Sequence, residues 1–198
     1  FFFFFESLFS NLLENMISSD KTIDLPLESS IWIDSTGIIY FIRSDKVRKY
    51  EPCRKKSSKI ITLPTPGLLN DYYSLGGDSV GRLYITDTYN HMIRTLDLND
   101  PTAPLVPVAG NGASTQPENG ALATATGIGF PVQIWVNAKG HFFFADYEAC
   151  NVYEVNEEGR IYKILGTGSY GGELRLGSSS GLTQIGSPVG IVGDVLGN

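Results

Sequence analysis

Residues 81–97 read GRLYITDTYNHMIRTLD, and this stretch decides the fold. It holds two short runs of strand-forming residues, 83–85 and 92–96, on either side of the connection 87–90. Asp and Asn suit such a connection because their short side chains hydrogen-bond neighbouring backbone N–H groups, and Asn also tolerates positive φ. Two short strands around an Asp/Asn-rich connection predict a β-hairpin.

The same pattern recurs along the chain. Residues 140–146 (GHFFFAD) repeat residues 81–87 (GRLYITD), and a copy with a shorter connection begins at Gly37 (GIIYFI). Residues 190–198 resemble the approach to such a copy. The copies are marked by glycines that are 44, 59 and 57 residues apart, namely Gly37, Gly81, Gly140 and Gly197. A period of about 40–45 residues, lengthened by insertions, is typical of the four-stranded blade of a β-propeller.

A second landmark keeps the same spacing. Residues 108–112 (VAGNG) and 164–168 (ILGTG) each end an apolar run, and each leads into a loop rich in Gly, Ser and Ala. Both loops end at a proline, Pro131 or Pro188, that lies nine residues before the glycine of the next copy. The loops, residues 110–129 and 166–187, are long for connectors, and such lengths are usually functional or disordered.

On these residues the sequence resembles the NHL-repeat family of β-propellers. The family pattern is a strand that ends in Asp, an Asn-His-x-Ile-Arg hairpin and an Ala-Gly-x-Gly loop. The copy at 81–112 matches it at Asp87, Asn90, His91, Ile93, Arg94, Ala109, Gly110 and Gly112. The copy at 140–168 has Ala149, Cys150 and Tyr153 at the Asn, His and Arg positions, and the copy at 37 has Arg43 in place of the strand-ending Asp. The resemblance implies a fold more than a function, because propellers host many activities.

We therefore predict an all-β chain that forms part of a β-propeller, with four-stranded antiparallel blades at residues 28–66, 67–112 and 130–168 and the start of a fourth at 188. The expected strands are residues 31–33, 38–42, 46–50, 59–62, 72–75, 83–86, 92–96, 105–109, 132–136, 142–145, 152–155, 161–165 and 189–192. Asp87 and Asp146 should end equivalent strands, so that the two hairpins superpose without a register shift. Because propeller rings use about four to eight blades, we interpret the chain as a fragment.

Residues 1–27 lie outside the repeat pattern. The apolar residues of this segment follow i, i+3, i+4 spacing, which predicts a short amphipathic helix; they are Phe5, Leu8, Phe9, Leu12, Leu13 and Met16. A disordered segment and the remnant of a signal peptide are the alternatives. No run reaches the roughly 20 apolar residues that cross a bilayer. The sequence leaves the compartment open, and an extracellular or membrane-attached parent protein is compatible with it.

The charge is uneven. The chain has a net charge of −6, but residues 43–59 contain eight Lys or Arg and two acidic residues. That stretch is therefore +6, which leaves −12 for the rest of the chain. One interpretation is a patch for phosphate or an acidic partner. The other is a solvated outer hairpin, because Lys and Arg also protect exposed strand edges.

The sequence shows no catalytic set, metal-binding set or cofactor motif. His91 lies in the hairpin position of the family pattern, and Asp87 and Asp146 end strands, so we expect structural roles for all three. A zinc site of the His type would need partners that the two histidines do not have. Cys53 and Cys150 have neither the spacing of a zinc site nor that of a disulfide framework.

The primary hypothesis is a non-enzymatic scaffold that binds a protein or small ligand through loops on one face. The exposed candidates for binding are Tyr89, Asn111, Asn119, Tyr147 and Tyr170. The first alternative is part of a propeller enzyme, similar to the lyases and lactonases of this fold, whose metal site would lie in blades outside this chain. The second is RNA binding, which the acidic charge outside residues 43–59 disfavours.

Closure of the ring gives a last expectation. Each blade of a propeller is covered by both neighbours, so blade one and the start of a fourth blade should each leave an apolar face uncovered. Soluble monomers rarely tolerate large exposed apolar patches. We therefore expect an open arc of three blades that self-associates in solution.

Overall fold

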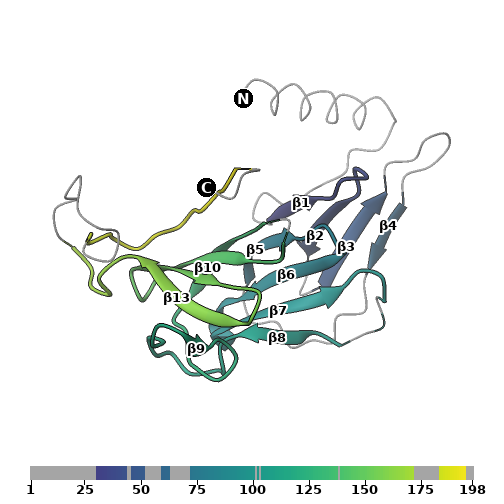
Figure 1. Cartoon of the computed structure of the whole chain (residues 1–198). Coiled ribbons are helices and arrows are strands. Elements are labelled where there is room, and N and C mark those ends of the chain that lie inside the picture. The colour runs from purple at the N-terminus through teal and green to yellow at the C-terminus, as the bar shows by residue number, and fades with distance from the viewer. Residues whose placement is uncertain are drawn as a thin grey trace.

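Three antiparallel sheets make up the described part of the molecule (Figure 1). The computed structural model describes residues 30–43, 46–51, 59–62, 72–100, 102, 104–137, 139–171 and 183–194. Apart from one short 3₁₀ helix, every regular element in these ranges is a strand, which confirms the all-β prediction. The helix predicted within residues 1–27 lies outside the described residues, as does Cys53.

Each sheet is one blade whose first four strands follow chain order. Blade one is β1 (Ile31–Ile33), β2 (Ile39–Arg43), β3 (Lys46–Glu51) and β4 (Lys59–Thr62). Blade two is β5 (Tyr72–Gly77), β6 (Arg82–Asp87), β7 (Met92–Asp97) and β8 (Val106–Ala109), with the 3₁₀ helix η1 (Thr88–Asn90) between β6 and β7. Blade three is β10 (Pro131–Val136), β11 (Phe142–Asp146), β12 (Asn151–Val155) and β13 (Arg160–Leu165). A short extra strand, β9 (Ala121–Leu122), pairs with the outer side of β13.

One turn chemistry recurs between the strands. The side-chain oxygen of Asp78 accepts hydrogen bonds from the backbone N–H groups of Val80 and Arg82 at 3.0 and 2.9 Å. The same pattern, with the residues two and four positions on as donors, occurs at Asp34, Asn137 and Asn156. An Asx side chain closes a turn in this way because it replaces a backbone acceptor. This chemistry explains why Asx-x-x-Gly recurs in the sequence.

The predicted register of the two matching hairpins is confirmed. Asp87 lies opposite Met92 in blade two, and Asp146 lies opposite Asn151 in blade three. The remaining residue pairs of β11 and β12 correspond in the same way: each is a β6–β7 pair with both residue numbers increased by 59. The residue that ends each connection adopts left-handed backbone geometry, with φ of 52° at His91 and 49° at Cys150.

The glycine that follows each outer strand is required by that geometry. A Cβ atom on Gly110 would overlap the carbonyl oxygen of His91, and one on Gly166 would overlap that of Cys150. Both glycines also have positive φ, which L-residues with a Cβ atom rarely adopt. The Ala-Gly-x-Gly pattern therefore marks the point where the outer strand passes close behind the left-handed residue.

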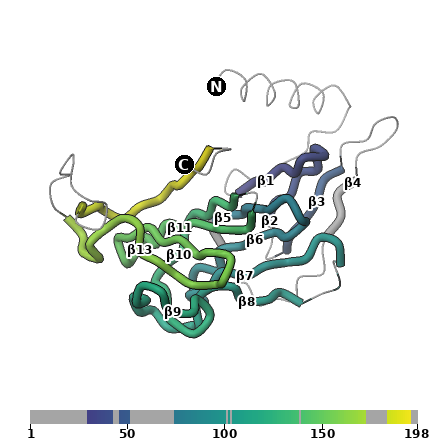
Figure 2. The backbone as a smooth tube through the Cα atoms, in the orientation of Figure 1, coloured from purple at the N-terminus to yellow at the C-terminus, as the bar shows by residue number. Residues whose placement is uncertain are grey.

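The blades contact one another through their first strands. β5 packs against β1 on one side and against β10 on the other, and the tube view shows these strands side by side (Figure 2). The Trp32 ring covers Gly77 of the next blade, where a Cβ atom would overlap the indole. Between blades two and three the earlier blade supplies the glycine and the later blade the larger residue, because Gly76 faces Val136. Large side chains on one blade are thus matched by glycine on its neighbour.

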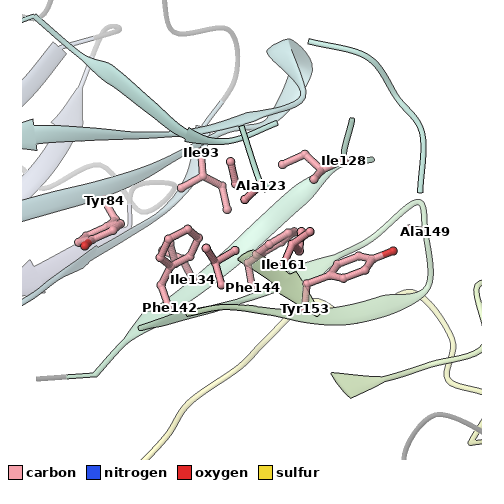
Figure 3. Close-up of a cluster of buried hydrophobic side chains, with 12 residues drawn as sticks. Tyr84, Ile93, Ala123, Ile128, Ile134, Phe142, Phe144, Ala149, Tyr153 and Ile161 are labelled. Carbon is pink, nitrogen blue, oxygen red and sulfur yellow. The ribbon is translucent and has the colours of Figure 1, made fainter. Parts of the chain in front are cut away.

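A continuous apolar core fills the space between blades two and three (Figure 3). Tyr84 and Ile93 of blade two face Phe142 and Phe144 of blade three, and the Tyr84 and Phe142 rings lie 5.3 Å apart. Ala123 and Ile128, from the loop that precedes β10, close one end of this core and are fully buried. A second cluster joins blades one and two in the same way, around Tyr40, Ile42, Leu83 and Ile85.

The predicted strand at residues 189–192 is not found. Residues 183–194 form no strand, because a strand requires a paired neighbour and the described residues supply none for this segment. Its position nevertheless fits the start of a next blade, since Gly193 lies against the Trp135 ring of β10 as Gly77 lies against Trp32. Val189 and Val192 are exposed, as predicted for a segment with an uncovered face.

The prediction of an uncovered apolar face on blade one is wrong for its central residues. Ile39, Phe41 and Tyr50 point away from blade two, yet each is at most 5% exposed. They form a small cluster of their own with Ile33 packed against it. Their burial means that these three side chains do not form the uncovered apolar face that was expected.

Candidate binding face

The two ends of the blades carry different kinds of connection. Because the strands of each sheet alternate in direction, the β6–β7 and β11–β12 connections lie at the same end as the long loops between blades. We call this end of blades two and three the loop face; its described residues are 88–91, 110–117, 124–130, 147–150, 166–171 and 183–188. The opposite end, the turn face, holds the Asx turns and comprises residues 34–38, 78–82, 97–100, 137, 139–141 and 156–160.

A buried carboxylate organises the β6–β7 connection. The Asp87 side chain is 0% exposed and accepts a hydrogen bond from Arg94 Nε at 2.6 Å. The Asn90 amide donates to both carboxylate oxygens at 2.9 and 3.0 Å. Charge-assisted hydrogen bonds of this kind are the stronger ones in proteins. They hold η1 in place and leave Tyr89, in the middle of the connection, 48% exposed.

The connection is fixed to the next blade through Phe130. The rings of Tyr89 and His91 both meet the Phe130 ring edge-on, at centroid distances of 5.2 and 5.1 Å. His91 Nδ1 lies 2.8 Å from the Gly129 carbonyl oxygen, and since a carbonyl only accepts, this nitrogen carries the proton. The backbone N–H of Tyr147 donates to the Phe130 carbonyl at 2.9 Å. Tyr89 and Tyr147 therefore belong to one surface centred on Phe130.

Asp146 occupies the same position in blade three as Asp87 in blade two, but its hydrogen-bond donors are different. Its carboxylate accepts hydrogen bonds from three backbone N–H groups, those of Gly129, Phe130 and Ala149, at 2.7, 2.9 and 3.0 Å. Burial raises the pKa of Asp146 above its ordinary value, and the three N–H groups act against that rise. The side chain therefore ties the β11–β12 connection to the start of β10.

The loop of residues 110–129 is held in a defined conformation by hydrogen bonds. Two backbone hydrogen bonds cross it: Gly110 N–H donates to the Ala123 carbonyl at 2.9 Å, and Ile128 N–H donates to the Ala113 carbonyl at 3.1 Å. Ser114 Oγ donates to Glu148 of the β11–β12 connection at 2.7 Å. Gln116 Nε2 donates to the Gly168 carbonyl at 3.3 Å. The loop thus crosses blade three and contacts the next long loop.

The structure places the five predicted binding residues in two regions. Tyr89, Tyr147 and Tyr170 are exposed on the loop face, at 48%, 47% and 80%. Asn111 lies there too, but its amide is bonded within the loop to Ala125 and Ala113. Asn119 lies at the outer edge of blade three, where its Oδ1 accepts from Lys163 N–H at 2.7 Å. A binding role for these residues stays a prediction.

Phe130, on which this surface depends, was not among the predicted binding residues. The only signal was its position directly before the proline that ends the long loop. The contacts of Ser114 and Gln116 carried no local signal, because their partners lie 34 and 52 positions away.

Charge separates the two faces. Among the described residues of the loop face there is no Lys or Arg, and the only acidic residue is Glu148. The residues given above for the turn face include nine charged ones: Asp34, Asp78, Arg82, Asp97, Asp100, Lys139, Glu157, Glu158 and Arg160. The loop face therefore offers tyrosine rings, hydroxyls and amides rather than formal charge.

No metal centre is present in the ranges that the structure describes, since no three His, Cys, Asp or Glu side chains there are grouped to hold an ion. Cys150 is free and buried. Among the same residues, no helix has the length and apolar character needed to cross a membrane.

The comparisons with known proteins support the fold. No family model matches the sequence, and no curated protein matches it. A structural genomics protein of unknown function from Bacteroides thetaiotaomicron has a similar structure, with a TM-score of 0.61 and 14% sequence identity. The match covers 80% of the present chain and 40% of that protein. The chain has the fold of part of a β-propeller.

Two further solved structures share these blades. An auxiliary nutrient binding protein from Bacteroides ovatus is similar to 67% of the chain over 34% of its own length, with a TM-score of 0.53 and 21% identity. A chain of a nidogen/laminin complex is similar to 69% over 47% of its own length, with a TM-score of 0.51 and 12% identity. The propeller chain spans less than half the length of each of these structures. At such identities the similarity concerns the fold, which is shared with binding proteins.

Proposed function

We propose that this chain is part of an NHL-repeat propeller that acts as a non-enzymatic scaffold and binds a protein or another ligand through the loop face. The observation that carries the proposal is the surface around Phe130. There, Tyr89 and Tyr147 are exposed on connections that buried carboxylates and a neighbouring blade hold in place.

Pre-organisation favours binding on this face. Ordering a loop when a ligand binds costs free energy, and a loop that is already held avoids that cost. Tyrosine combines a large apolar ring with a polar hydroxyl, which is why it is enriched in the central parts of interfaces. The loop face presents three such rings on connections tied together by the bonds of Ser114 and Gln116.

The NHL assignment is supported by what the pattern residues do. Asn90 and Arg94 hold Asp87, and His91 supplies the left-handed residue that ends the connection. Gly110 gives the close approach behind it. The residues that carry the resemblance thus form one structural unit.

The charge of the loop face makes a nucleic acid an unsuitable ligand. Nucleic acids are bound mainly through phosphate contacts from Lys and Arg, and the described loop face has neither. A protein surface or a neutral ligand suits this face better.

The test compares two triple variants on arrays of proteins and of glycans. The loop-face variant carries Tyr89→Ala, Tyr147→Ala and Tyr170→Ala, and the turn-face control carries Lys139→Ala, Glu157→Ala and Glu158→Ala. Truncation of an interface anchor commonly costs about 1–2 kcal/mol or more. A ligand that binds the wild type should therefore lose at least about tenfold in affinity for the loop-face variant and bind the control unchanged. A ligand lost by the turn-face control alone, or no ligand on either array, would contradict the proposal.

A further inference from the structure

Blade one lacks the carboxylate that balances an arginine in blade two. In the register of β2 and β3, Arg48 lies opposite Phe41, as Arg94 lies opposite Ile85 in β6 and β7. Arg48 is therefore the counterpart of Arg94. The position of Asp87, however, is taken by Arg43, which ends β2 opposite Lys46. Where blade two has the acidic partner of Arg94, blade one therefore has a second positive residue.

Arg48 has an unpaired buried donor in the part of the chain that the structure describes. Its Nε is buried and makes no hydrogen bond, whereas Arg94 Nε lies 2.6 Å from the Asp87 carboxylate. A buried donor without an acceptor destabilises the folded state, and the effect is larger when the donor is charged. A group that supplied an acceptor would remove this penalty.

The surroundings favour an anion. Lys46 is exposed and lies two residues from Arg48, so it points to the same face of β3. The acid on this strand, Glu51, is bonded to Lys49 at 2.8 Å and so is already paired. Guanidinium groups match the geometry of carboxylate and phosphate oxygens.

We propose that Arg48 anchors an oxyanion-binding site on blade one, at the position that the Asp87 carboxylate fills in blade two. The ligand is a free phosphate-type ion or a carboxylate of an acidic peptide segment, which share the same acceptor chemistry. The site lies on a different blade from Tyr89 and Tyr147 and is independent of the loop-face proposal.

The test measures binding of inorganic phosphate and of a hexaglutamate peptide by isothermal titration calorimetry, each at matched ionic strength. The wild type should bind at least one of them. Arg48→Met should weaken that binding at least tenfold, whereas the control Lys49→Met, on the other face of the same strand, should change it less than threefold. Binding of phosphate alone identifies a site for a free ion, and binding of the peptide alone identifies a site for an acidic partner.

A second pair of variants keeps the proposal testable if Arg48→Met fails to fold. Arg43→Asp restores a carboxylate at the Asp87 position, so it should raise the Tm and abolish binding of the anion. Arg43→Asn removes the same positive charge without adding a carboxylate and should not raise the Tm. Binding by neither anion, unchanged binding in Arg48→Met, or equal Tm values for Arg43→Asp and Arg43→Asn would overturn the proposal.

Discussion

Two buried aspartates show how one structural position can be filled by different chemistry. Asp87 is balanced by the side chains of Asn90 and Arg94, and Asp146 by three backbone N–H groups. A buried carboxylate is tolerated only when it is paired or hydrogen-bonded. The replacement of Arg94 by Tyr153 in blade three is therefore acceptable, because the backbone there supplies the donors.

The close approach of the outer strand can be tested at Gly110. In Gly110→Ala, the new Cβ atom would overlap the His91 carbonyl at a positive φ of 82°. We expect a loss of about 3 kcal/mol in the free energy of unfolding, from left-handed strain of about 1–2 kcal/mol together with overpacking of about 1–3 kcal/mol. The matched control is Gly37→Ala, where φ is 86° but no atom lies near the added Cβ. Equal losses in the two variants, measured by urea denaturation, would contradict the steric argument.

Three buried tyrosines give a prediction for alkaline pH. Burial raises the pKa of Tyr40, Tyr84 and Tyr153 to about 12, and Asp34, Asp78 and Asp146 respectively add to that rise. A tyrosine with a raised pKa in the folded state contributes stability that is complete below pH 10 and is lost as the pH rises from 10 to about 12. The stability should therefore fall across this range.

Absorbance at 295 nm should show these groups as a late phase near pH 12, and Tyr84→Phe should reduce its amplitude. A titration curve of Tyr84→Phe that overlays the wild-type curve would contradict the burial of this hydroxyl.

At the residue scale, the structural roles of His91, Asp87 and Asp146 could be predicted from the sequence. Asp87 and Asp146 each end a strand, and His91 ends the connection that follows Asp87, so all three carry a local signal. The identity of the donors to Asp146 could not be predicted, because Gly129 and Phe130 are 17 and 16 positions away and reach it only in the folded chain.

At the scale of elements, the loop of residues 110–129 shows that length alone does not mean disorder. Gly120 N–H donates to the Ile161 carbonyl and Ala123 N–H to that of Gly159, both at 2.8 Å. These bonds make β9 an extra edge strand of blade three. Such an edge strand covers part of an edge that would otherwise present unpaired backbone groups.

Hydrogen exchange should detect this edge strand. The amides of Gly110, Gly120 and Ala123 are expected to exchange at least tenfold more slowly than in a synthetic peptide of residues 108–130, because all three donate to backbone carbonyls. Exchange at the rate of the free peptide would show that the loop is not held against blade three.

The expected strands of blades one to three were found within two residues of their predicted bounds. Alternating or apolar runs between Gly, Asp and Asn carry that information locally. β9 was missed because Ala121–Leu122 lies in a run of Ala, Thr and Gly with no strand pattern. Its extended form depends on contacts with β13 and Asn119 that sequence spacing does not show.

At the scale of the whole molecule, blade packing follows an alternation of large and small side chains. Trp32 meets Gly77, Gly76 meets Val136, and Trp135 meets Gly193. The repeat period predicted the blades, but not which side chains would meet between them. That choice depends on the sizes of residues about 45 to 60 positions apart.

Self-association remains our expectation for this 198-residue chain. Val189 and Val192 are 70% and 87% exposed on the segment that covers part of blade three, and exposed apolar surface of this kind promotes association. Sedimentation velocity should show species larger than a monomer, and Val189→Lys with Val192→Lys should reduce their share. A compact monomer for the wild type at all concentrations would contradict this expectation.

The arrangement of repeated blades is tested most directly by nuclear Overhauser effects from the two indole rings. The chain has two tryptophans, and each lies against a glycine of the segment that follows its own blade. We predict contacts from the Trp32 ring to the Hα protons of Gly77 and from the Trp135 ring to those of Gly193. Indole contacts restricted to the tryptophan's own sheet, or an exchange of the two glycine partners, would contradict the arrangement of blades described here.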